Sequence, residues 1–227
     1  MTSTARLLQL CSQALPVGAY AYSGGLESAI STGYVFDRQS ALVWISGVFE
    51  TSVAQLDLPA LVLAETAWRE QDQETLDLIN DYLQANRESG ELLLEDVDMG
   101  RSLQRLLNDL GEPHPACRSP SFVTLFAVAG VNWHIPVGEL IAGYCYSWLE
   151  NQVAAATKSV PLGQTDAQRM LGELLALIDA AVNAAMAIAA SESAKDSLED
   201  WSFGRSLPML GLLSARHETL DARLYRS

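Results

Sequence analysis

The sequence predicts an all-α protein: a single-domain multi-helix bundle with a short C-terminal helical tail. Apolar residues recur at spacings of three and four along most of the 227 residues, and no segment shows the alternation of a half-buried strand. Hydrophobic residues make up 49% of the chain and charged residues 19%, which is the balance of a globular protein with a core. We expect the bundle to span residues 1–190, and a polar linker and tail to span residues 191–227.

The predicted helices of the first part of the chain begin and end at residues that favour helix caps. Asp before a helix and Pro in its first turn mark N-termini, and Gly marks C-termini. These signals predict helices from Leu7 to Cys11, ended by Pro16; from Gly25 to Gly33; from an N-cap at Asp37 to Val53; and from a second N-cap at Asp57 to Trp68.

The rest of the bundle is predicted by the same signals. Amphipathic patterns give two helices before a proline-rich connector, and longer, more apolar patterns give three after it. The predicted helices are Gln73–Arg87, Glu91–Leu110, Phe122–Trp133 capped by Ser121, Val137 to about Ser159, and Asp166–Ala190 capped by Thr165 after a break at Val160–Gly163.

The charge of the chain limits its partners. A formal net charge of −14 and a pI near 4.5 disfavour binding to nucleic acid or to an anionic membrane surface, and they favour basic proteins or cations. The alternative is that the acidity only gives solubility. Three widely spaced cysteines indicate reduced thiols, and the longest apolar runs are too short to cross a bilayer. We therefore expect a cytoplasmic protein.

No catalytic constellation stands out in the sequence. A phosphate-binding lysine loop, a dinucleotide-binding glycine motif, and metalloprotease and serine-hydrolase motifs are all absent. His114 and Cys117 supply only half of a closed zinc site. We expect no enzymatic activity, no metal site and no tightly bound cofactor. Two alternatives remain open, a generic helical adaptor and a helical enzyme or cofactor binder whose pocket is lined by Trp133, His134, Cys145 and Tyr146.

Two loops have compositions suited to partner binding. In Leu15–Gly25, Tyr20 and Tyr22 alternate with alanines, so both rings are expected on one side, either in a protein interface or packed inward. In Ala154–Gln168, Lys158 lies in the last turn of a helix, where it is either available to a partner carboxylate or part of an ordinary capped turn.

The C-terminal segment is expected to have little of its own to pack against. Ser191–Gly204 is charged and polar and is predicted to be a mobile linker. Pro208–Ser227 resumes a helical pattern, but a helix this short is marginal in water. The tail must therefore pack either on its own domain or on a partner. The predicted apolar stripe consists of Leu213, His217, Leu220 and Leu224.

Three sequence blocks resemble the UreF family of urease accessory proteins. They are LPVGAYAYSGGLE at Leu15–Glu27, TKSVPLGQTDAQ at Thr157–Gln168, and SARHETLDARLYRS at Ser214–Ser227, and they occur in the order of that family. The sequence departs from the pattern at Tyr22, where some members have histidine, and at Ala167, where many have glycine. Because a histidine is one candidate ligand in such a loop, the tyrosine makes direct nickel coordination there more doubtful.

The resemblance implies a non-catalytic, all-helical homodimer that works within a complex. It implies binding to the accessory protein UreD, called UreH in some organisms, recruitment of the GTPase UreG, and action on apo-urease, with nickel handled by the assembly. The loop around Tyr20 would face the dimer or the GTPase, Lys158 would lie near the GTPase or the metal route, and Arg223 would dock on UreD with the tail Arg216–Tyr225. Our own hypothesis is that the tail is loose in the isolated protein and becomes ordered in that complex. The implied partner-binding residues are Tyr20, Tyr22, Glu27, Lys158, Gln164, Gln168, Arg216, His217, Glu218, Leu220, Arg223, Leu224 and Tyr225.

Overall fold

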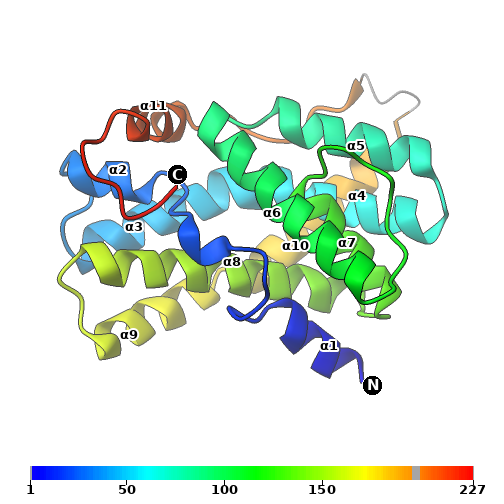
Figure 1. Cartoon of the computed structure of the whole chain (residues 1–227), viewed down its shortest axis with the longest axis horizontal. Coiled ribbons are helices and arrows are strands. Elements are labelled where there is room, and N and C mark those ends of the chain that lie inside the picture. The colour runs from blue at the N-terminus through cyan, green and yellow to red at the C-terminus, as the bar shows by residue number, and fades with distance from the viewer. Residues whose placement is uncertain (1, 196–199, 227) are drawn as a thin grey trace.

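The computed structural model describes residues 2–195 and 200–226, and the regular elements in these ranges are all helical (Figure 1). The all-α prediction is therefore confirmed. The α-helices are α1 (Ser3–Leu10), α2 (Leu26–Ser31), α3 (Arg38–Val48), α4 (Leu58–Arg69), α5 (Gln73–Ala85), α6 (Gly90–Asp109), α7 (Phe122–Asn132), α8 (Val137–Ser159), α9 (Gln164–Leu175), α10 (Ile178–Ser193) and α11 (Pro208–His217). A 3-10 turn, η1 (Ala19–Ala21), and a π-helical segment, η2 (Phe49–Asp57), complete the set.

The centre of the bundle is one continuous helical rod, Arg38–Arg69, formed by α3, η2 and α4. The expectation that Asp57 starts a new helix is wrong. Asp57 has helical backbone angles (φ −65°, ψ −45°) and its side chain makes no cap hydrogen bond. The wide π turns end where Leu58 N–H donates to the carbonyl of Val53, five residues back. The next residue after Leu58 is Pro59, which has no N–H to donate to a helical hydrogen bond.

Helix α4 forms the core with α5, α7 and α10, which all pack against it. Helix α7 is buried along nearly its whole length, because its sequence from Phe122 to Gly130 has no charged residue to present to solvent. Glycines permit the closest helix crossings. A Cβ at Gly100 of α6 would collide with the backbone of Pro120 and Ser121, just before α7. The chain therefore needs glycine there for α6 and α7 to meet.

The N-terminus of α7 is capped from another helix. Ser121 occupies the N-cap position but its own side chain does not cap the helix. Instead, Oδ1 of Asp96, on α6, accepts hydrogen bonds from the Phe122 N–H at 2.9 Å and from the Ser121 hydroxyl at 3.0 Å. The predicted helix start is correct, but the predicted source of the cap is wrong.

The predicted helix Asp166–Ala190 is interrupted. It divides into α9 and α10 between Leu175 and Ile178, and Gly163 rather than Thr165 occupies the N-cap of α9. Two helical stretches are long and apolar enough to cross a membrane, Arg38–Arg69 and Gln164–Ser193, the second of which includes the break between α9 and α10. The first is mostly buried as the core rod. The second is buried along one face, where α10 packs on α4 and α8.

The described parts of the expected linker are packed on the bundle. Glu192 is buried and accepts hydrogen bonds from Lys195 Nζ at 2.7 Å and from the Ser202 N–H at 3.1 Å. The ring of Phe203 stacks on Tyr82 with centroids 4.6 Å apart. Residues 191–195 and 200–204 of the predicted mobile linker therefore pack on the bundle in the structure. Residues 196–199 lie outside the described part.

The tail packs on its own domain. Helix α11 contacts α2 and α6, and Leu210 and Leu213 are buried there. The predicted stripe is wrong beyond His217, because the helix ends at that residue and the chain continues without regular structure. As a result Leu224 lies 71% exposed, while the neighbouring Tyr225 is buried.

Candidate partner-docking site

Three segments that are far apart in the sequence meet at one place on the surface. They are the loop before α2 with the first turn of α2, the C-terminal turn of α8, and the tail after α11. Figure 1 shows the C-terminus beside the blue segment that precedes α2, and the Arg226 N–H donates to the Ala21 carbonyl at 2.8 Å. We call this place the tail junction. It contains residues from all three of the sequence blocks described above.

Glu27 is the acceptor that holds the tail. Its carboxylate, in the first turn of α2, accepts hydrogen bonds from the backbone N–H groups of Leu224 at 2.7 Å and Tyr225 at 3.1 Å, and Nε2 of His217 lies 2.8 Å from it. Gly25 has a φ of +81°, and a Cβ there would stand 3.0 Å from Leu210 of α11. Glycine thus lets the chain turn into α2 at close range to the tail.

His217 and Arg223 connect the tail to α6. His217 is fully buried, and its Nδ1 lies 3.0 Å from Oε2 of Glu91. Arg223 is partly exposed and its guanidinium lies 3.8 Å from the same carboxylate. Glu91 is buried and faces both His217 and Arg223.

A contact between Lys158 and Tyr225 connects the second sequence block, Thr157–Gln168, to the tail junction. Lys158, in the last turn of α8, places Nζ 5.4 Å from the centroid of the Tyr225 ring, within the range of a cation–π contact. The Tyr225 hydroxyl lies 3.5 Å from the Ala155 carbonyl. Burial, and secondarily the charge of Glu27, raises the pKa of Tyr225, so this phenol stays neutral.

The two tyrosines of the first block point in different directions. Tyr20 is 67% exposed, whereas Tyr22 is buried and directs its hydroxyl to Asp98 at 3.3 Å. The expectation that both rings project to one side is wrong, because the 3-10 turn at Ala19–Ala21 replaces the extended backbone on which it was based. Tyr22 therefore contributes to the interior, and Tyr20 to the surface.

The remaining predicted site residues lie around or beyond the junction. Arg216 and Glu218 are exposed at the end of α11, and Leu220 is half-buried after it. Gln164 and Gln168 are exposed on α9, where they line a shallow pocket with Thr157 and Leu162.

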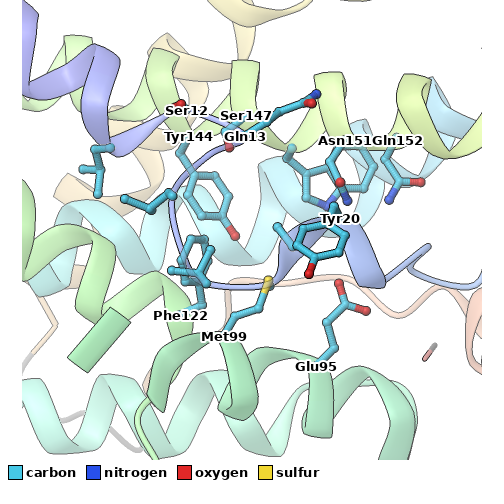
Figure 2. Close-up of a pocket in the computed structure, with 15 residues that line it drawn as sticks. Ser12, Gln13, Tyr20, Glu95, Met99, Phe122, Tyr144, Ser147, Asn151 and Gln152 are labelled. Carbon is cyan, nitrogen blue, oxygen red and sulfur yellow. The ribbon is translucent and has the colours of Figure 1, made fainter. Parts of the chain in front are cut away.

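Beside the junction lies an open, mostly apolar pocket of about 700 Å³, its mouth included. Figure 2 shows Tyr20, Met99 and Glu95 on one side of it and Phe122 and Tyr144 on the other. Its walls come from the N-terminal loop, α6, α7 and α8, so a shift of any of these helices would change its shape. An apolar pocket with polar groups at its edge is suited to receive an apolar or aromatic side chain.

The pocket proposed for a helical enzyme is not assembled. Cys145 is fully buried, and burial raises the pKa of its thiol to about 12. His134 is exposed, while Tyr146 lines a different pocket, near α1. Within residues 2–195 and 200–226, no three His, Cys, Asp or Glu side chains are grouped as a metal-ion site.

A buried ionic cluster behind the pocket was missed by sequence reasoning. Arg87, just after α5, lies 2.8 Å from Asp57 and 3.3 Å from Asp96, and the Tyr144 hydroxyl donates to Asp57 at 3.2 Å. Burial tends to lower the pKa of Arg87, but the two carboxylates outweigh it and raise the value. Burial raises the pKa of Asp57, and the charge of Arg87 opposes that shift. The available signal was Asp57 itself, the single charge between Val53 and Leu63.

Comparisons with known proteins agree with the resemblance seen in the three blocks. A sequence model of the UreF family matches residues 35–175. The urease accessory protein UreF of Teredinibacter turnerae is 46% identical over 224 residues, covering 97% of both chains. The UreF proteins of Marinomonas sp. and Chromohalobacter salexigens are 44% and 42% identical, covering 98% of this chain and 93% and 94% of theirs. These relatives match over nearly the whole chain, and this chain therefore belongs to the UreF family of urease accessory proteins.

Proposed function

We propose that this urease accessory protein is a non-catalytic bridge in the complex that inserts nickel into apo-urease. In this proposal it binds UreD (UreH) and the GTPase UreG, modulates the GTPase, and acts as a cytoplasmic homodimer. Nickel is the cargo of the assembly rather than a cofactor held tightly by this chain. The observation that carries the proposal is the tail junction, where the three blocks typical of the family meet on one surface.

The junction has the features of a docking surface. Tyr20 and Leu224 expose large apolar side chains, at 67% and 71%, next to backbone that is held in place by Glu27. Arg223 adds a half-exposed cation to a chain whose overall charge is −14. Aromatic and arginine side chains on a rigid surface are the residues that most often dominate binding energy. Residues such as His217 and Tyr22 support this surface from the interior.

We expect Tyr20→Ala and Arg223→Ala each to weaken binding to UreD or UreG by roughly tenfold or more, since each removes an exposed anchor. Thermal unfolding should be nearly unchanged, because neither side chain fills core volume. The measurement is quantitative pull-down of purified UreD and UreG by each variant.

Tyr34→Ala is the matched control, because Tyr34 is an exposed tyrosine outside the three blocks. It should bind both partners like the wild type. Unchanged binding by both Tyr20→Ala and Arg223→Ala, with the Tyr34→Ala control equally unaffected, would reject the junction as the docking surface.

A further inference from the structure

The pocket beside the tail junction is bordered by a buried amide that has no hydrogen-bond partner. Gln152, on α8, lines this pocket and is only 3% exposed. Among the described residues, none donates a hydrogen bond to its side-chain amide or accepts one from it. A primary amide has an acceptor oxygen and a donor NH₂ group, and leaving them unpaired in a buried place is costly. A group bound in the pocket can supply the missing hydrogen bonds.

Aromatic side chains form much of the rest of the pocket. Figure 2 shows Phe122 and Tyr144 on one side of it, and Tyr20 and Met99 on the other. The indole of Trp148 also lines it. Aromatic rings and thioethers both make favourable contacts with a further aromatic ring. The pocket volume of about 700 Å³, mouth included, accommodates such a ring and part of the residue next to it.

The charge around the pocket favours a cation. Glu95, on α6, is the charged residue among those that line it. Asp98, nearly one turn further along α6, has a half-exposed side chain, and Arg101 approaches it only to 3.9 Å. The chain as a whole carries a net charge of −14. An aromatic group with a positive charge beside it therefore suits the pocket better than one with a negative charge.

We propose that this pocket is the docking site for an aromatic side chain of a partner protein, next to a basic residue in the partner's sequence. The aromatic ring enters between Tyr20 and Phe122. The Gln152 amide binds a polar group of the same segment, and the basic residue faces Glu95. That the segment belongs to UreD or UreG rests on the proposed function, whereas the chemistry of the pocket does not.

The first test measures the binding of three small phenols to the free protein: tyramine, which carries an ammonium group, the neutral p-cresol, and p-hydroxyphenylacetate, which carries a carboxylate. The readout is the NMR shift of ¹³C-labelled methionine methyl groups. We expect the Met99 methyl to respond, with tyramine bound roughly threefold or more tightly than p-hydroxyphenylacetate. The methyl of Met186, exposed on α10 and outside the pocket, is the internal control. No response at Met99, or no preference for tyramine, would overturn the proposal.

Gln152→Met separates a binding role of the amide from a structural one. Methionine keeps the volume and removes polar atoms that have no partner among the described residues, so the urea midpoint should stay the same or rise. Tyramine binding should weaken roughly threefold or more, because the lost hydrogen bonds form only with the bound molecule. Unchanged tyramine affinity in this variant would contradict the proposed role of Gln152.

Ser147→Phe tests the pocket in complex formation. Ser147 lines the pocket from α8, so a phenylalanine ring there takes the place of the partner's ring. We expect this variant to lose tyramine binding and to bind UreD or UreG roughly tenfold or more weakly in a pull-down. Ser46→Phe, which adds the same ring to a half-exposed position on α3, is the control.

The outcomes distinguish this proposal from the proposed function. Weaker partner binding by Arg223→Ala with normal binding by Ser147→Phe would overturn the pocket as a docking site and leave the proposed function standing. Normal partner binding by Tyr20→Ala, Arg223→Ala and Ser147→Phe alike, with tyramine bound as expected, would reject the proposed function and assign the pocket to a different basic partner.

Discussion

Replacing Arg87 with methionine should lower the free energy of unfolding by about 3–5 kcal/mol, because two buried carboxylates would lose their counter-ion. Arg87 is the cation within hydrogen-bonding distance of both Asp57 and Asp96, and its side chain is only 11% exposed. Methionine fills a similar volume, so the loss reports the charge more than the packing. Urea unfolding at pH 7, followed by circular dichroism, measures it.

The cost of Arg87→Met should shrink in acid. Burial raises the pKa of Asp57 above its unfolded value, so the stability linked to this carboxyl is complete below the unfolded pKa and is lost as the pH rises through the folded one. Without the opposing charge of Arg87, the variant loses more stability than the wild type as the pH rises. We therefore expect the difference between wild type and variant to narrow from about pH 7 to about pH 5.

A control variant outside the cluster and a double variant within it test this prediction further. Arg169→Met removes an exposed partner of Asp166 on α9 and should change stability by less than about 0.5 kcal/mol. Asp57→Asn combined with Arg87→Met should regain part of the loss, since it removes one unpaired buried charge. A cost for Arg87→Met no larger than that of Arg169→Met would mean that the cluster does not stabilise the fold.

The sequence alone predicted most helix positions because the deciding interactions are local. The Asp37 cap and the amphipathic stripe of Gln73–Arg87 depend on residues three or four apart, and both appear in the structure. Asp57 was misread for the same reason. Followed by Leu58 and Pro59, it has the pattern of an N-cap, and only its distant partner Arg87 shows that it lies inside a helix.

The three blocks indicated which segments form the tail junction, but they did not predict the contacts between those segments. Its central contact joins Glu27 and His217, which are 190 residues apart, and nothing in either local sequence specifies the other. The stripe drawn through His217 and Leu224 assumed that α11 continued, whereas hydrogen bonds to Glu27 fix the chain after His217 without a helix. The resemblance to a family indicated three segments. The structure shows that the first and third meet at the Glu27 carboxylate, and that Lys158 of the second lies over the Tyr225 ring.

Gly100→Ala should destabilise the protein by about 3 kcal/mol, and more if the helices separate, because the new methyl group has no flexible neighbour that can move aside. Its Cβ would lie 2.8 Å from the carbonyl carbon of Pro120 and 2.9 Å from that of Ser121, both backbone atoms. The clash lies one turn after Asp96, whose carboxylate caps α7. Separating α6 from α7 would therefore also weaken that cap and move Met99 in the wall of the pocket.

Gly90→Ala, in the first turn of the same helix, is the matched control. A Cβ at Gly90 meets no atom within 4 Å, so alanine should be neutral or stabilise α6 by about 0.5–1 kcal/mol. The two variants add the same methyl group to the same helix, so the difference between their urea midpoints isolates the crossing with α7. Equal midpoints would show that α6 and α7 can move apart without loss. A large difference would identify this crossing as the contact that keeps α6, with Glu91 near its start, in place against the tail.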